Sequence, residues 1–101
     1  MTDQSVILVN LLKVEPANCD RLLGLLKQNT ETVIRTLAGW TSTRLIAAKD
    51  RTSVVIYSEW ESAGAVEAMR NDPRMQACFP EISALASLTS VIGATVFSEA
   101  G

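Results

Sequence analysis

The chain has 101 residues, of which 48 % are hydrophobic and 20 % are charged, and its formal net charge is −2. These values predict one globular domain over residues 1–101 and exclude a disordered tail, which combines few large apolar residues with a high net charge. They also exclude a nucleic-acid partner, because nine Lys and Arg against eleven Asp and Glu leave no basic surplus for phosphates. The chain contains no histidine, so the commonest general base, metal ligand and haem ligand is missing.

The apolar content predicts association with a second copy of the chain. A domain of this size buries only about 60–65 % of the surface that its unfolded chain exposes, so one small core cannot hide all of these side chains. No apolar run approaches the ~18–20 residues of a membrane helix, and we expect no membrane span. Cys19 and Cys78 form no disulfide-scaffold pattern and no signal peptide is recognisable, so we expect a cytoplasmic protein with both thiols buried and reduced.

The first part of the chain predicts a strand followed by a helix. Residues 5–15 are rich in β-branched side chains and apolar on both faces, which predicts a strand covered by helices on one face and by another sheet or subunit on the other. Pro16 then opens a helix near Ala17, and Gly39 stands where that helix is expected to stop. The helix presents one apolar stripe formed by Leu22, Leu25, Leu26, Asn29, Val33, Ile34 and Leu37.

The middle of the chain predicts an antiparallel hairpin. Residues 40–49 and 52–60 have the alternation of strands, and only two residues separate them. In the second of these strands Trp60 shares a face with Ile56, whereas Tyr57 lies on the opposite face.

The next segment predicts short helices. Ser62 is a plausible N-cap for a helix that ends near Arg70, and Asp72 caps a further helical turn that begins with a proline. Pro80 interrupts this second helix, and a separate helical turn is expected over residues 81–86.

The last strand is expected over residues 88–98, again apolar on both sides. The order of elements is therefore β-α-β-β-α-β, which predicts an α+β ferredoxin-like βαββαβ fold with a four-stranded antiparallel sheet and helices on one face. Two copies can hide the bare apolar face by packing sheet to sheet.

Most arrangements of catalytic or cofactor-binding residues are missing. Without histidine there is no Ser-His-Asp or Cys-His arrangement, and a zinc site would need two distant cysteines together with carboxylates. The five glycines stand singly, so no glycine-rich phosphate loop is present. The sequence therefore predicts neither a metal site nor a cofactor.

Asn10 is a polar residue in an apolar strand. Asparagine is depleted in strands, and a buried amide without a hydrogen bond costs roughly 1–3 kcal/mol. One interpretation is a donor to an oxyanion or a bound oxygen species inside a dry pocket. The other is a structural asparagine bonded to a neighbouring strand or a helix end.

Trp60 ends the third strand on the face of Ile56, and antiparallel pairing is expected to bring it near Asn10. Its indole offers one N–H donor and a large flat wall, although a core tryptophan is the alternative. The second helical region adds a soft apolar cluster that suits either a core or a pocket for a flat ligand: Met69, Met75, Cys78 and Phe79.

Four segments carry a likeness to a known family: LVNLLKVEP at 8–16, AGW at 38–40, VVIYSEWES at 54–62 and NDPR at 71–74. Together they resemble the antibiotic biosynthesis monooxygenase family over nearly the whole chain. The resemblance implies a homodimer of ferredoxin-like protomers, the dimeric α+β barrel, with a pocket between sheet and helices. In the anthrone-oxidising members it implies oxidation of phenolic rings by O2 without metal, flavin or haem. The substrate loses a proton, the resulting carbanion reduces oxygen, and the protein binds, orients and stabilises charge.

The resemblance also implies roles for individual residues. Asn10 matches the first-strand asparagine of some anthrone oxygenases and of the haem-degrading branch, and Trp60 matches a tryptophan that both branches share. As the catalytic residues, Asn10 is expected to donate to the enolate or peroxide oxygen, and Trp60 to orient the ring or donate its N–H. The residues expected to bind the substrate are Ile56, Val66, Met69, Met75 and Phe79.

The chain departs from the family at three of these positions. Ile56 stands where several monooxygenase members carry a second asparagine, and Val66 and Phe79 fall about where one well-known type carries Tyr and Arg. Phe79 also falls about where haem-degrading relatives carry the axial histidine, so haem degradation is not expected. Quinol-oxidising relatives often use a histidine, which this chain lacks.

The predicted function is a cofactor-independent monooxygenase that uses O2 to oxidise a small phenolic or polycyclic aromatic substrate, anthrone-like or quinol-like. The loss of polar residues at positions 56, 66 and 79 favours an alternative, a non-catalytic small-molecule-binding or structural dimer on the same fold. A cyclase or isomerase is a third possibility, and it needs an acid or base that the sequence does not locate.

Overall fold

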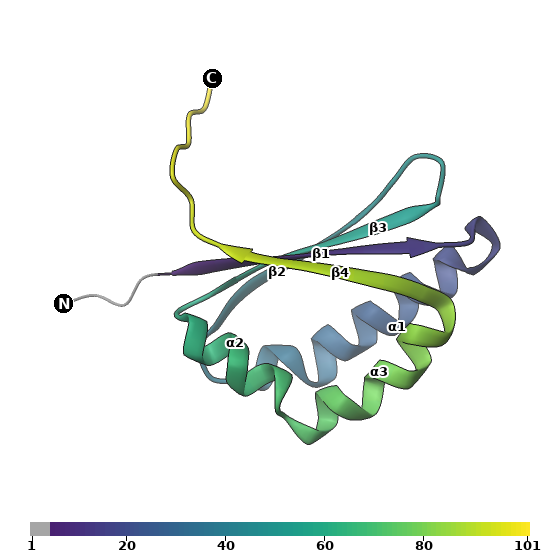
Figure 1. Cartoon of the computed structure of the whole chain (residues 1–101), viewed down its shortest axis with the longest axis horizontal. Helices are drawn as coiled ribbons and strands as arrows, with labels where there is room; N and C mark the ends of the chain where they lie inside the picture. Colours follow the sequence, from purple (N-terminus) through teal and green to yellow (C-terminus); the bar gives the residue numbers. More distant parts are fainter. Residues whose placement is uncertain (1–4) are drawn as a thin grey trace.

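A four-stranded antiparallel sheet carries all the helices on one face in the computed structural model, which describes residues 5–101 (Figure 1). The elements are β1 (Val6–Val14), α1 (Cys19–Thr32), β2 (Trp40–Ala47), β3 (Ser53–Trp60), α2 (Ala63–Arg70), α3 (Pro73–Leu85) and β4 (Ala86–Gly93), with short 3-10 turns at Pro16–Asn18 and Ile34–Thr36. The strand order is β2-β3-β1-β4. This arrangement confirms the predicted ferredoxin-like α+β fold.

Strand β1 lies inside the sheet and pairs with β3 on one side and β4 on the other. Its side chains alternate between the two faces, as the period of two requires. Leu8 and Leu12 are buried beneath the helices, whereas Leu11 is exposed on the opposite face. The prediction of a strand with two apolar faces is therefore confirmed for β1.

Helix α1 is shorter than predicted. It begins at Cys19 and ends at Thr32, and a 3-10 turn follows it. The β-branched pair Val33 and Ile34 disfavours further α-helix, because their side chains crowd the preceding turn. Gly39 does not cap α1; at a φ of 85° it turns the chain into β2 instead.

Helix α3 runs without interruption from Pro73 to Leu85, so the predicted break at Pro80 is wrong. Proline removes the N–H that would bond to the carbonyl of Gln76. Both residues lie on the exposed side of the helix, where water can take that carbonyl. The predicted caps of the two helices are confirmed: Ser62 Oγ accepts from the N–H of Ala65, and Asp72 accepts from the N–H of Arg74.

Strand β4 begins two residues earlier than predicted and ends at Gly93, not at residue 98. Its last pair joins Gly93 to Ile7, close to the start of β1. Within the described residues, the chain beyond Gly93 has no strand to pair with, and it runs away from the sheet on the side opposite the helices (Figure 1). Val96 and Phe97 are exposed there.

The core between sheet and helices consists of two apolar clusters. One is formed by Leu8, Val33, Trp60, Val66, Met69 and Met75. The other is formed by Leu12, Val14, Cys19, Leu22, Leu26 and Val54. Both contribute to the wall of the same cavity, so the space between sheet and helices is not completely filled.

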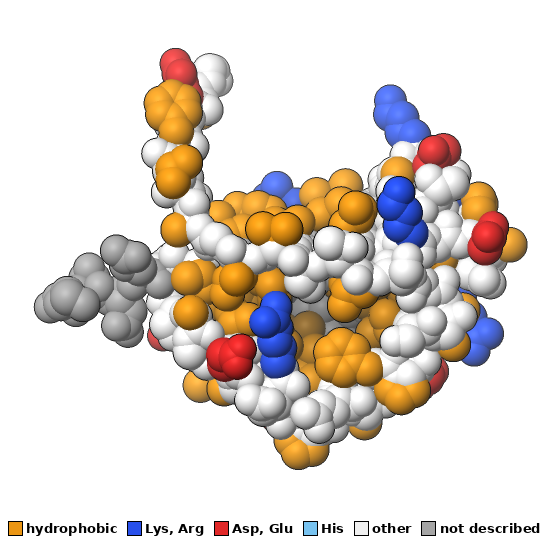
Figure 2. All heavy atoms as spheres, in the orientation of Figure 1, with side chains coloured by type: hydrophobic (Ala, Val, Ile, Leu, Met, Phe, Trp, Pro, Cys, Tyr) orange, Lys and Arg blue, Asp and Glu red, His pale blue; other side chains and the backbone are white. Residues whose placement is uncertain are grey.

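The outer face of the sheet is apolar and carries no helix of the described chain. Hydrophobic side chains follow the edge of the molecule that faces away from the helices (Figure 2). The alternation of the strands assigns to this face Ile7, Val9, Leu11, Ile46, Val55, Tyr57 and Val91. No helix within residues 5–101 is long and apolar enough to cross a membrane.

Replacing Gly39 by alanine is expected to lower the free energy of unfolding by about 2–4 kcal/mol. The new Cβ would meet Ala65 Cβ at 2.5 Å, and the φ of 85° disfavours any side chain. Gly24→Ala is the matched control. Its Cβ meets nothing within 4 Å inside α1, so helix propensity is expected to raise the free energy of unfolding by about 0.5–1 kcal/mol. Urea unfolding at one fixed protein concentration measures both; equal stability of the two variants would contradict the packing argument.

Candidate active site

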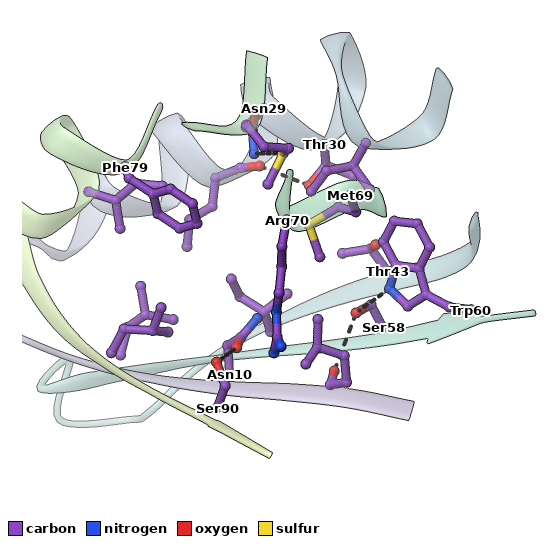
Figure 3. Close-up of a pocket in the computed structure, with 18 residues that line it drawn as sticks. Asn10, Asn29, Thr30, Thr43, Ser58, Trp60, Met69, Arg70, Phe79 and Ser90 are labelled. Atoms are coloured by element: carbon purple, nitrogen blue, oxygen red, sulfur yellow. Dashed lines mark hydrogen bonds between the residues drawn. The ribbon is translucent and has the colours of Figure 1, made fainter. Parts of the chain in front are cut away.

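A cavity of about 280 Å³ lies between the sheet and the helices (Figure 3). This volume is close to the lower end of the range for small-molecule sites, roughly 300–1,000 Å³. Ten of its lining side chains are apolar: Leu8, Leu12, Leu26, Ile34, Ile56, Met69, Met75, Phe79, Ile82 and Leu88. The others carry a nitrogen or oxygen atom: Asn10, Asn29, Thr30, Thr43, Ser58, Trp60, Arg70 and Ser90.

The structure brings most of the predicted site residues to this cavity. Both predicted catalytic residues, Asn10 and Trp60, line it, as do the predicted substrate-binding residues Ile56, Met69, Met75 and Phe79. Val66 is the exception. It is 0 % exposed and packs in the same core cluster as Trp60 and Met69, so it supports the wall without forming part of it.

Asn10 lies at the centre of the sheet, opposite Ile56 on β3 and Ser90 on β4. Its Oδ1 accepts a hydrogen bond from the hydroxyl of Ser90. Its Nδ2 donates to no described residue, yet no buried side-chain nitrogen or oxygen of the described chain lacks a partner. Nδ2 is therefore open to the cavity. The amide bonds to a neighbouring strand with its oxygen and offers its N–H groups to a bound molecule.

Trp60 is held by a chain of two hydrogen bonds. Its Nε1 donates to Ser58 Oγ at 3.1 Å, and Ser58 Oγ donates to the Leu8 carbonyl at 3.3 Å. The indole is 1 % exposed. The N–H is thus already used, and what Trp60 presents to the cavity is a rigid aromatic surface.

The strand register separates Trp60 from Asn10. Trp60 pairs with Val6, whereas Asn10 pairs with Ile56, four residues away along β3. At about 3.3 Å per residue, this offset is about 13 Å. The two residues share a wall of the cavity but lie in different parts of it (Figure 3). The expectation that pairing brings them close together is wrong.

Asn29 is a second buried amide, which the sequence analysis placed in an apolar stripe. Its Nδ2 donates to Met75 Sδ at 3.3 Å, and its Oδ1 accepts from Cys78 Sγ at 3.1 Å. Both partners lie on α3, so Asn29 fastens α1 to α3 through sulfur atoms, which are weak hydrogen-bonding groups. Cys78 is only half-buried, so the prediction of two buried thiols is correct for Cys19 alone.

Arg70 is a further polar residue of the cavity that the sequence analysis did not single out. It lies in the last turn of α2, and its side chain extends across the opening toward Asn10 and Ser90 (Figure 3). The sequence marks it only as a basic residue one position after Met69, at a helix end. No acid, histidine or tyrosine stands among the lining residues of the described chain.

The shifted carboxyl groups lie outside the cavity. Hydrogen bonds from Arg74 hold the pKa of Asp72 below its ordinary value, and hydrogen bonds from Thr52 do the same for the pKa of Asp50. These carboxylates stabilise a helix start and a turn. Within residues 5–101, no group of three or more His, Cys, Asp or Glu side chains is placed to hold a metal ion.

The sequence profile of the family described as "Antibiotic biosynthesis monooxygenase" matches residues 5–81. A curated relative, the "Tetracenomycin-F1 monooxygenase" of Streptomyces glaucescens, is 38 % identical over 72 residues, which cover 71 % of this chain. The same alignment spans 64 % of the relative's length.

Two solved structures have a very similar fold. A monooxygenase from the gene ActVA-Orf6 of Streptomyces coelicolor, in complex with nanaomycin D, has a TM-score of 0.87 and 25 % identity, and the match covers 98 % of this chain and 94 % of that one. SnoaB, a cofactor-independent oxygenase from Streptomyces nogalater, has a TM-score of 0.84 as its N63A mutant, with 17 % identity over 94 % of this chain and 96 % of that one.

Ser58→Ala is expected to lower the free energy of unfolding by about 1–3 kcal/mol, because it leaves the buried N–H of Trp60 without an acceptor. In the double variant Ser58→Ala/Trp60→Phe, the loss of unfolding free energy should be smaller than the sum of the losses in the two single variants, because the donor is then absent as well. Ser83→Ala on the exposed side of α3 is the control and should change stability by less than about 0.5 kcal/mol. Urea unfolding of the native protein, the two single variants and the double variant measures the coupling between Ser58 and Trp60. Strictly additive losses of unfolding free energy would show that the hydrogen bond contributes nothing.

Proposed function

This chain belongs to the antibiotic biosynthesis monooxygenase family, and we propose that it is a cytoplasmic monooxygenase that oxidises a phenolic or polycyclic aromatic compound with O2 and without a cofactor. The observation that carries the proposal is the cavity: an apolar space with a neutral amide donor, Asn10, open to it. The names of the relatives, among them tetracenomycin-F1 monooxygenase, support a polycyclic aromatic substrate.

The proposed reaction draws its electrons from the substrate. A ring CH2 flanked by aromatic rings and activated by a phenolic or keto oxygen loses one proton, and the resulting carbanion transfers electrons to O2. A peroxide forms on that carbon, its O–O bond breaks, and water leaves while the carbon becomes a carbonyl. One molecule of O2 thus converts CH2 to C=O and yields one H2O. Since the lining residues include no acid, histidine or tyrosine, the first proton leaves to water at the opening.

The protein's part in this scheme is to bind, orient and stabilise. The Asn10 N–H groups donate to the enolate oxygen and then to the peroxide oxygen, and the apolar wall strengthens these hydrogen bonds by excluding water. Trp60 serves as an orienting surface because its N–H is bonded to Ser58. The apolar residues that hold the rings are Ile56, Met69, Met75 and Phe79.

A non-catalytic dimer that binds a small molecule is the second candidate. Ile56 and Phe79 make the wall apolar at positions where the resemblance implies polar residues, and this observation favours the second candidate. Both candidates use the same cavity, so oxygen consumption distinguishes them.

We also propose that the protein is a homodimer whose two sheets pack face to face. Leu11, Ile46 and Val91 on the outer face are 36 %, 46 % and 63 % exposed in a single chain. An apolar face of this extent is rare on a monomer, and a second copy offers the matching surface.

Oxygen uptake with 1,8-dihydroxyanthrone and with a naphthohydroquinone tests the activity. The native protein is expected to consume oxygen, and Asn10→Ala to lower the rate about 100-fold, as the loss of one oxyanion donor does elsewhere. Trp60→Phe should lower it about ten-fold through poorer orientation. Asn18→Ala, at an asparagine whose side chain makes no capping hydrogen bond, is the matched control and should be unchanged. Equal oxygen uptake by all four proteins would show that neither Asn10 nor Trp60 contributes to catalysis. No uptake by the native protein would favour the non-catalytic binding dimer.

Sedimentation equilibrium tests the dimer. The native protein is expected at twice its chain mass of 10.9 kDa. Leu11→Glu places a carboxylate in the middle of the outer face and should shift the mass to that of a monomer, since burying an unpaired charge is very unfavourable. Ala77→Glu, which adds the same charge to the exposed side of α3, should leave the dimer intact. A monomeric native protein would refute the proposal.

A further inference from the structure

Arg70 is the only charged side chain among the lining residues of the described chain. It extends from the end of α2 across the opening of the cavity, toward Asn10 and Ser90 on the sheet (Figure 3). Its side chain is 41 % exposed, so the guanidinium is reachable from solvent and from the cavity. An arginine in this position is placed to contact a ligand at the opening.

The guanidinium of Arg70 has little else to bind. Its one ion-pair partner is Glu67, at 4.0 Å, and that carboxylate is itself 68 % exposed. By contrast, Arg74 donates to both carboxylate oxygens of Asp72 at 3.3 Å, and Arg51 donates to Asp20. A guanidinium has five N–H donors in a fixed plane, and those of Arg70 donate no hydrogen bond to a described residue. The cavity opening therefore offers an unused fork of donors.

We propose that Arg70 binds a carboxylate on the aromatic substrate, with the ring system in the cavity and the carboxylate at the opening. A carboxylate accepts two parallel hydrogen bonds from a guanidinium, whereas a single phenolate oxygen cannot match this geometry. The proposal extends the proposed function by naming the substrate class, a ring-fused aromatic acid, and it rests on that function only in placing an aromatic ring in this cavity.

The contact also fixes the orientation of the substrate. Arg70 reaches in from the helix layer and extends toward Asn10 on the sheet, so both donors face the same part of the cavity. With the carboxylate at Arg70, the ring system is held by the end that carries the acid, and the rest of it lies against the apolar wall. Arg70 is thus a specificity-determining residue that selects an aromatic acid and fixes which end of it is bound at the opening.

The net charge of the protein cannot select an acid in place of the contact with Arg70. The formal net charge of −2 repels an anion at long range, so selection of an acid must come from the local interaction. None of the lining residues is acidic, and Glu67 is the nearest competitor for the guanidinium. Neutralising Glu67 should therefore strengthen the binding of an acid.

Isothermal titration with a matched pair of ligands tests the proposal without relying on turnover. The native protein is expected to bind anthraquinone-2-carboxylate about ten-fold more tightly than anthraquinone-2-carboxamide, which has nearly the same shape and no charge. Arg70→Gln should weaken binding of the carboxylate ten-fold to about thirty-fold and leave the carboxamide unchanged. Arg70→Lys should lie between the two, because an ammonium keeps the charge but not the fork.

Two further variants and one further ligand complete the test. Arg74→Gln, at an arginine outside the cavity, should bind both ligands like the native protein, and Glu67→Gln should bind the carboxylate two-fold to about four-fold more tightly. Ionised 2-hydroxyanthraquinone presents a phenolate in place of the carboxylate. If Arg70→Gln weakens binding of the phenolate and not binding of the carboxylate, the named substrate class is wrong.

The outcomes separate this proposal from the proposed function. An equal loss of affinity for both ligands in Arg70→Gln would make Arg70 a packing residue and overturn the proposal. The proposal would also be overturned if the native protein showed no preference for the carboxylate, or bound neither ligand. Carboxylate preference that depends on Arg70, in a protein that consumes no oxygen, would support the proposal while refuting the monooxygenase. Oxygen uptake without carboxylate preference would do the reverse.

Discussion

The register of β1 between its two neighbours is the constraint on which the site depends. This register sets Asn10 opposite Ile56 and Ser90, with its side chain on the helix face of the sheet. A slip of one residue would turn Asn10 to the outer face and bring an apolar neighbour into the cavity. Burial excludes such a slip, because it would turn Leu8 and Leu12 away from the helices as well. The apolar residues that make the fold stable are therefore the ones that hold the polar residue in place.

Most polar groups of the cavity are occupied by the fold itself. Trp60 donates to Ser58, Ser58 to the Leu8 carbonyl, and Asn29 bonds to sulfur atoms on α3. A buried polar group without a partner is costly, so a small domain with an open cavity must satisfy nearly all of them internally. The groups left over, the Asn10 amide and the Arg70 guanidinium, are accessible from the cavity or its opening. Of the eight polar lining residues, Asn10 and Arg70 are therefore the two principal candidates for ligand contact.

Patterns within a single element were predictable from the sequence, and relations between elements were not. The β-branched apolar run at 5–15 and the alternation at 52–60 predicted β1 and β3 to within one residue at each end, and Ser62 and Asp72 predicted the helix starts. The offset between Trp60 and Asn10 was missed because strand pairing depends on where both strands begin, which neither pattern states. Arg70 was missed for the same reason: a basic residue at a helix end is ordinary, and only the packing of α2 over the sheet brings it to the cavity.

Under the proposed function, the neutral amide of Asn10 and the charged guanidinium of Arg70 have different tasks. A carbanion reduces oxygen readily only if its electrons are not held too firmly. A neutral amide such as Asn10 stabilises an oxyanion by hydrogen bonding and places no unpaired charge in the apolar cavity. Arg70 stands at the opening, where its charge is partly screened by water and by Glu67. Ile56 and Phe79 contribute apolar surface to the wall against which the ring system lies. The loss of polar groups at those two positions is thus compatible with catalysis, because the proposed reaction needs only binding, orientation and hydrogen bonds to oxygen from the protein, while Arg70 selects the substrate.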